Sequence, residues 1–108
     1  MMNGKYQCIE TLEGHRGWVK SLVELNKDTF ASGSRDTTIK IWEKNWDTFQ
    51  ILEGHTNDVL SLVQLKEDTF ASGSWDETIK IWTKRIILFQ YKLQLFPYKV
   101  RLQCLVSF

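Results

Sequence analysis

The feature that most constrains this sequence is an internal repeat with a period of 40 residues. The segment Thr11–Lys44 can be laid on Ile51–Lys84 without a gap, and 23 of the 34 aligned residues are identical. Self-similarity at a fixed period of this length indicates a fold built from stacked copies of one supersecondary unit. With 108 residues, the chain has room for two such units. We therefore expect a repeat architecture.

Within each unit the residue pattern is that of short β-strands. In the first unit, runs of strand length occupy residues 19–25, 29–34, 38–43 and 47–52, and short polar segments separate them. The run 38–43 alternates apolar and polar side chains, whereas 19–25 is largely apolar, which is typical of a strand buried on both faces. Each unit is expected to form a four-stranded antiparallel meander. Because such a sheet has two apolar faces, it must stack on further copies to bury them.

Two motifs recur in the same order in both units. A Gly-His pair opens each unit, at residues 14–15 and 54–55, and the run DTFASGS leads to TIKIW, which ends on Trp42 or Trp82. This combination resembles the WD-repeat β-propeller family. The resemblance covers about residues 5–90 and is specific, because several motifs recur in order at the period of the family.

The resemblance implies an all-β fold. We expect a partial β-propeller of two four-stranded antiparallel blades, with a short β-like or irregular C-terminal tail. Two features depart from the family pattern. Glu43 and Thr83 follow the closing Trp where the family usually has Asp, and there are only two repeats where propellers usually have several blades.

The repeat also suggests where the parts of the chain begin and end. A third Gly-His pair is due at residues 94–95, but the sequence there is Gln-Leu, so the pattern stops after a plausible fourth strand near Phe89. By resemblance, residues 5–12 take the place of a fourth strand, which in propellers belongs to the neighbouring blade. We expect four parts: residues 1–12 as the outer strand of a preceding blade, 13–52 as repeat one, 53–91 as repeat two, and 92–108 as a non-repeat tail.

The tail differs from the repeats in charge. Residues 1–84 have a net charge of −3, whereas residues 85–108 contain four basic and no acidic residues. Alternating apolar residues there favour two further strands. A basic and apolar tail is also suited to an anionic membrane surface, but its period is not helical, so a membrane partner is not expected. A further interpretation stays open, that the chain is a truncated piece of a longer repeat protein.

Each unit contains a His, a Ser, an Asp and a Trp at matching positions. Ser, His and Asp are also the ingredients of a nucleophilic triad. The resemblance instead implies a buried hydrogen-bond network, and two identical copies favour architecture over one active site. We therefore expect a non-catalytic protein without a metal or cofactor, since no motif for either is found. The network residues are His15, Ser32, Asp36 and Trp42, and His55, Ser72, Asp76 and Trp82.

Partner binding is expected at positions where the two copies differ. Identical positions serve the blade itself, and the differing ones cluster after the Gly-His pair and in the turn between the second and third strands. By resemblance, both clusters lie on one rim of the propeller, where partners usually dock. Trp and Arg are enriched at interface hot spots. The basic and aromatic candidates Arg16, Trp18, Lys20 and Arg35 suit an acidic or phosphorylated segment, and Asp58, Trp75 and Glu77 form a more acidic surface.

These observations predict a WD-repeat scaffold that binds other proteins or peptides. The alternative is a structural, self-assembling β fragment of a longer propeller protein with no ligand of its own. Two stacked blades leave two apolar faces exposed, so we expect either assembly with further copies of the chain or membership of a larger propeller. The nearly balanced charge favours no nucleic-acid partner. Without a signal peptide or an apolar run long enough to span a membrane, a cytoplasmic location is expected, with the nucleus left open.

Overall fold

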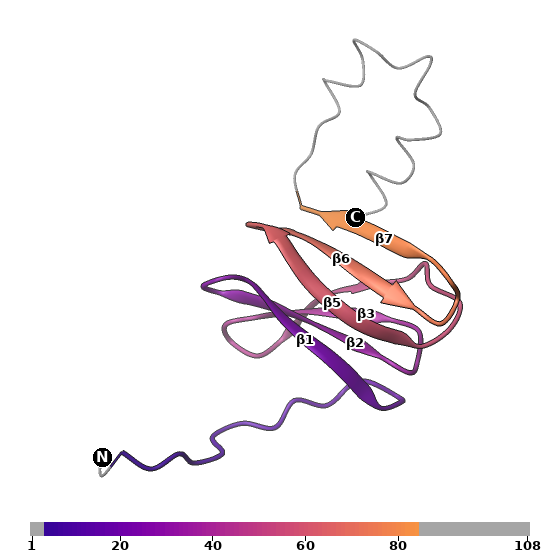
Figure 1. The fold of residues 1–108 in the computed structure, drawn as a ribbon. Helices are drawn as coiled ribbons and strands as arrows, with labels where there is room; N and C mark the ends of the chain where they lie inside the picture. Colours follow the sequence, from indigo (N-terminus) through magenta and orange to yellow (C-terminus); the bar gives the residue numbers. More distant parts are fainter. Residues whose placement is uncertain (1–3, 85–108) are drawn as a thin grey trace.

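The computed structural model describes residues 4–84, and all of its regular elements are β-strands (Figure 1). They form a four-stranded sheet of order β1-β2-β3-β4 and a three-stranded sheet of order β5-β6-β7, which we call blade one and blade two. Every paired neighbour is antiparallel. The strands are β1 (Val19–Asn26), β2 (Thr29–Ser34), β3 (Ile39–Glu43), β4 (Thr48–Leu52), β5 (Val59–Lys66), β6 (Thr69–Ser74) and β7 (Ile79–Thr83).

The predicted all-β fold is confirmed. In blade one the four strands begin and end within one residue of the predicted runs, because the polar turn segments fix where each strand stops. Blade two repeats the first three strands. The fourth strand expected near Phe89 and the tail at 92–108 lie outside the described residues.

The two blades share the same register. Leu22 pairs with Ser32 in blade one, as Leu62 pairs with Ser72 in blade two, and the register shifts between β1 and β2 recur between β5 and β6. The turns after β2 and β6 are also equivalent, with positive φ values of 76° at Thr37 and 74° at Glu77. Identical sequence at the paired positions thus produces nearly identical sheets.

The core lies between the two blades, where β1 and β2 pack against β5. Leu25 and Ile39 of blade one are buried against Val59 and Phe70 of blade two. At Gly33 the blades come so close that an added Cβ would lie 2.6 Å from Val59 Cγ1. A glycine is therefore required at this position by the approach of the next blade.

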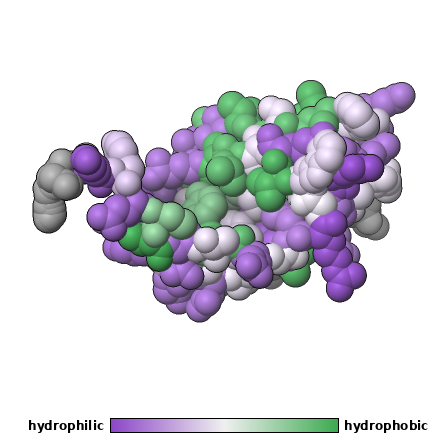
Figure 2. All heavy atoms as spheres, turned by 90° about the horizontal axis from the view of Figure 1, so that it is seen from below, coloured by the Kyte–Doolittle hydropathy of each residue, from purple (hydrophilic) through white to green (hydrophobic). Residues whose placement is uncertain are grey.

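The outer faces of the pair remain exposed, and here one sequence expectation is wrong. The run 19–25 was expected to be buried on both faces, but Leu22 is 64% exposed, whereas its equivalent Leu62 is only 7% exposed. The difference arises because Leu62 faces blade one and Leu22 faces no other described blade. Figure 2, which views the molecule from below relative to Figure 1, shows apolar side chains gathered on this side beside the N-terminal arm.

Residues 4–12 form an extended N-terminal arm that leads away from the sheets (Figure 1), and the loop 13–18 joins it to β1 and packs against blade one through His15. No strand is assigned within the arm, and the side chains of Tyr6 and Ile9 are exposed. The pairing of residues 5–12 with a preceding blade therefore stays a prediction.

Candidate functional site

The structure brings His15, Ser32, Asp36 and Trp42 together in blade one. His15 comes from the loop before β1, Ser32 from β2, Asp36 from the turn after β2, and Trp42 from β3. His15 Nδ1 lies 2.9 Å from Asp36 Oδ2, and His15 Nε2 lies 2.6 Å from Ser32 Oγ. Trp42 Nε1 donates to the same Ser32 Oγ at 2.8 Å. Four separate segments are thus joined by one chain of hydrogen bonds.

Blade two contains the same arrangement. His55 Nδ1 lies 2.7 Å from Asp76 Oδ2, and His55 Nε2 lies 2.6 Å from Ser72 Oγ. Trp82 Nε1 donates to Ser72 Oγ at 2.8 Å. The agreement between blades is expected, because the strand register that sets these positions is the same in both.

The donors and acceptors fix the direction of the chain in each blade. An indole N–H can only donate, so Ser72 Oγ accepts from Trp82. The hydroxyl proton of Ser72 is then available to His55 Nε2, and His55 Nδ1–H donates to the carboxylate of Asp76. Each buried polar group therefore has a partner, which is what burial of such groups requires.

The two aspartates are further held by threonines that sequence reasoning missed. Thr38 donates to Asp36 Oδ1 through both its backbone N–H and its hydroxyl, and Thr78 does the same for Asp76. The backbone N–H groups of Arg16 and Thr56 donate to the other carboxylate oxygens. A sequence signal existed, since Thr follows Asp at the same spacing in both copies.

These hydrogen bonds keep both carboxylates ionised. Burial acts to raise the pKa of Asp36, but hydrogen bonds from Thr38, the Arg16 backbone and His15 outweigh it and hold the pKa far below its usual value. For Asp76 the hydrogen bond from the Thr78 hydroxyl is the largest influence, and it lowers the pKa well below its usual value. Both aspartates therefore act as permanent acceptors near neutral pH.

The geometry is unfavourable for nucleophilic catalysis. Ser32 and Ser72 are 3% and 1% exposed, so a substrate cannot reach either hydroxyl in this conformation. Each Oγ also accepts the indole N–H, which occupies a lone pair that a nucleophile would use. Within residues 4–84, no group of three or more His, Cys, Asp or Glu residues is placed to hold a metal ion.

A second group of side chains lies at the end of the blades where the loop before β1 meets the turn after β2. We call it the rim cluster; its members are Trp18, Lys20, Arg35 and Trp75. Lys20 Nζ lies 5.5 Å from the ring centroids of both Trp18 and Trp75, so it bridges the two blades. The Arg35 guanidinium lies 5.1 Å from the Trp18 ring centroid. These are cation–π distances. Both Trp side chains stay largely exposed, at 68% and 62%.

The other expected binding residues lie in different surroundings. Asp58 was expected on an exposed acidic surface, but it is 8% exposed and its Oδ2 lies 3.7 Å from Lys20 Nζ. The ion pair crosses the interface between the blades, which explains the burial of Asp58. Arg16 and Glu77 are exposed, as a binding role would require.

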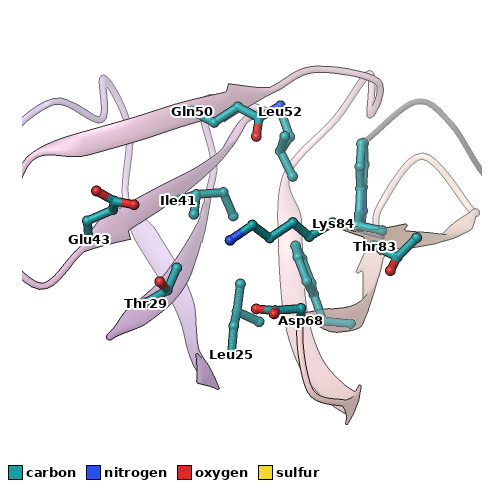
Figure 3. A pocket seen from close by; sticks show the side chains of 11 residues that line it. Leu25, Thr29, Ile41, Glu43, Gln50, Leu52, Asp68, Thr83 and Lys84 are labelled. Atoms are coloured by element: carbon teal, nitrogen blue, oxygen red, sulfur yellow. The ribbon is translucent and has the colours of Figure 1, made fainter. Parts of the chain in front are cut away.

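A cavity of about 270 Å³ opens between the blades at the opposite end from the rim cluster (Figure 3). Apolar side chains such as Leu25 and Ile41 line it, and the side chain of Lys84 points into it (Figure 3). Asp68, at its edge, accepts a hydrogen bond from Asn26 across the interface at 2.6 Å. This cavity combines residues of both blades and was not predicted from the sequence.

Comparison with known proteins identifies the class to which this arrangement belongs. The WD domain, G-beta repeat family (WD40) matches residues 6–43 and 46–83, which is most of the chain. The chain belongs to the WD40 family, in agreement with the two networks and the sheet order described above.

Curated relatives resemble single repeats. The chain is 53% identical over 38 residues to the pre-mRNA-splicing factor prp46 of Emericella nidulans, a match that covers 34% of this chain and 8% of that protein. It is 46% identical over 43 residues to the nuclear distribution protein PAC1 of Candida glabrata, which covers 40% of this chain and 9% of that protein. The matched part therefore spans less than a tenth of either relative.

Two computationally designed proteins have a similar structure. The chain superposes on the designed protein Ika4 with a TM-score of 0.63 and 32% identity, over 73% of this chain and 49% of that one. For Ika8 the TM-score is 0.60 and the identity 34%, over 68% of this chain and 23% of that one. In residues 4–84 of the present structure, no helix has the length and apolar character needed to cross a membrane.

Proposed function

We propose that this chain is a non-catalytic scaffold that binds an acidic or phosphorylated segment of another protein at the rim cluster. WD40 repeats imply a role in protein interaction in general, and the rim cluster is the surface whose chemistry suits it best. The observation that carries the proposal is the pair of largely exposed Trp side chains on either side of Lys20. Exposed Trp next to cationic side chains is typical of an interface hot spot.

The charges of the rim cluster favour an acidic partner. Among the described residues, no carboxylate lies within ion-pair distance of Arg35, whose guanidinium packs against Trp18. Lys20 is partly balanced by Asp58, and exposed Arg16 adds a further positive charge nearby. A bound carboxylate or phosphate would accept hydrogen bonds from Arg35, and the guanidinium is suited to bidentate contact with either group. Glu77 would disfavour a partner that is acidic along its whole length.

The remaining features support the same role. The buried Ser32 and Ser72 fit a structural network, so we assign no reaction, metal or cofactor to the chain. We propose a cytoplasmic location, with the nucleus as the alternative because the relative from Emericella nidulans is named a pre-mRNA-splicing factor. Imaging of the tagged chain distinguishes the two compartments. The competing function, a structural β fragment without a ligand, predicts that changes in the rim cluster affect no binding.

The experiment is a peptide array in which Asp, Glu and phosphoserine positions vary, followed by fluorescence anisotropy with the best binder. Trp75→Ala should weaken binding about 30-fold, since truncation of a hot-spot residue costs about 2 kcal/mol or more. Arg35→Ala should weaken binding and also reduce its dependence on salt, because it removes a charge contact.

The matched control is Trp46→Ala. Trp46 is also an exposed Trp, at 41%, but it lies in the turn between β3 and β4 at the opposite end of the blade. The proposal predicts unchanged affinity for this variant. Equal losses for Trp46→Ala and Trp75→Ala, or no array binder at all, would contradict it.

A further inference from the structure

We infer that the exposed face of blade two is a docking surface for blade one of a second copy of this chain, so that copies assemble head to tail. This inference does not rest on the partner proposed for the rim cluster, although Trp18 of that cluster lies at the contact between copies. It rests on the fact that the two outer faces contain the same apolar side chains as the interface that the chain already forms within itself.

The apolar positions match across the two faces. The face of blade two presents Val63, Leu65, Ile79 and Ile81, which are 54%, 54%, 74% and 40% exposed. Their equivalents in blade one are the identical residues 23, 25, 39 and 41, which pack against blade two. The outer face of blade one presents Val19 and Leu22, whose equivalents at 59 and 62 are buried. A second copy would therefore repeat a contact for which both surfaces are already suited.

The space between the faces also matches. At Gly33 an added Cβ would lie 2.6 Å from Val59 Cγ1, whereas at the equivalent Gly73 nothing lies within 4 Å. The position that Val59 occupies above Gly33 is thus empty above Gly73, and it would receive Val19 of the second copy. Blade one correspondingly has a hollow on its outer face, lined by Val19, Leu22 and Phe30 among others.

Polar contacts across the internal interface can be compared position by position. Leu62 N donates to Ser21 Oγ at 3.0 Å. The equivalent residues on the outer faces are Leu22 of one copy and Ser61 of the other, which are identical in type. Asn26 Nδ2 donates to Asp68 Oδ1 at 2.6 Å. At the equivalent positions of a contact between copies, Lys66 of one copy would face Asp28 of the other, and these side chains have opposite charges.

Three further contacts are replaced. The pair Lys20 and Asp58 becomes Leu60 and Trp18, which is an apolar pair. Gln64 Nε2 donates to the Leu25 carbonyl at 2.9 Å, and its equivalent Glu24 lacks that donor, so one hydrogen bond is lost. The cation–π contact between Lys20 and Trp75 has Leu60 and Arg35 at the equivalent positions and is also lost. The outer faces are therefore complementary except at these last two contacts.

The N-terminal arm provides a second contact to the same neighbour. β4 ends at Leu52, two residues before the Gly-His pair of blade two, and Leu12 holds the same place before the pair of blade one. Among the described strands, β7 has no partner on its outer side. The arm of a second copy would pair with β7 as β4 pairs with β3 only by taking the place predicted for the strand near Phe89, which lies outside the described residues.

A head-to-tail contact closes into a ring or continues as an open chain. Propellers typically have about 4–8 blades, so a closed ring would contain two to four copies of this two-bladed chain. The test uses the full chain, analysed by size-exclusion chromatography with light scattering.

The key variant is Gly73→Val. In a single chain its added side chain meets open space, so the fold is expected to be unchanged by circular dichroism. In the assembly it would clash with Val19 of the next copy. We expect a defined mass of two to four chains, or a concentration-dependent series, for the original chain and a single-chain mass for Gly73→Val.

Mixing two variants tests the direction of the contact. Leu22→Glu places a charge on the outer face of blade one and leaves the outer face of blade two unchanged. Gly73→Val blocks the outer face of blade two and leaves that of blade one unchanged. Each alone should be a single chain, and an equimolar mixture should give a mass of two chains, because only one productive contact remains.

Three results would overturn the inference. The first is a single-chain mass for the original chain at all concentrations. This result would mean that the outer faces do not bind each other and are suited only to blades of another protein. The second is an unchanged mass or unchanged aggregation in Gly73→Val. The third is assembly of Leu22→Glu on its own, which would indicate a contact between like faces.

Discussion

Replacement of Ser72 by Ala should be among the most destabilising single changes in the chain. The hydroxyl of Ser72 accepts from Trp82 Nε1 at 2.8 Å and contacts His55 Nε2 at 2.6 Å, and the side chain is 1% exposed. Alanine leaves both partners buried without a hydrogen bond. Each unsatisfied buried group costs about 1–3 kcal/mol, so we expect a loss of about 2–6 kcal/mol in the free energy of unfolding.

The assay is urea unfolding followed by Trp fluorescence, with all chains at the same concentration because assembly would shift the apparent stability. With a slope of about 2 kcal/mol per molar urea, the middle of the typical range, the midpoint should fall by roughly 1–3 M. Thr56→Ala is the matched control, since Thr56 is exposed and uses its backbone N–H, not its side chain, to contact Asp76. A loss below about 0.5 kcal/mol for Ser72→Ala, the range of ordinary surface changes, would refute the assignment of Ser72 as the centre of the network.

Three further predictions follow from the same contacts. The pKa of Asp76 is lower in the folded than in the unfolded chain, so the ionised Asp76 side chain stabilises the fold above the usual pKa of 3.8. This contribution is lost as the pH falls below that value. The urea midpoint should therefore decline less steeply from pH 7 to pH 2 in Asp76→Asn than in the original chain. Gly33→Val should cost about 1–3 kcal/mol by crowding Val59, and a thermal midpoint equal to that of the original chain would exclude such crowding. Leu25→Ala should cost about 2–5 kcal/mol because the side chain is 4% exposed, whereas exposed Lys27→Ala should change the urea midpoint little.

The strands of blade one could be predicted from the sequence because their signals are local. Apolar and polar alternation and the polar turn segments placed all four strands within one residue of their observed ends. The family could be recognised for a related reason, since its motifs recur at a fixed period. Both kinds of signal can be recognised along the chain without knowing which strands pack together in space.

Burial could not be predicted from the same signals, because it depends on which blade lies beside a strand. Leu22 and Leu62 occupy the same position in nearly identical segments, yet they are 64% and 7% exposed. Asp58 similarly gave no sign of its burial, which results from its contact with Lys20 on the other blade. The hydrogen bond between Asn26 and Asp68 was also missed, since it joins residues in different units.

The equivalence of β1 and β5 has a consequence for folding. Both strands pair with the next strand in the same register, so a newly made chain could attach β5 to β2 in place of β1 with almost the same backbone hydrogen bonds. Repeat proteins are prone to such misassembly. Two contacts distinguish the correct order, that of Lys20 with Asp58 and that of Asn26 with Asp68. Three of these four residues differ from the equivalent residue of the other repeat, and only Asp68 has an identical equivalent. We expect these polar contacts between the blades to favour the correct order over an exchange of strands.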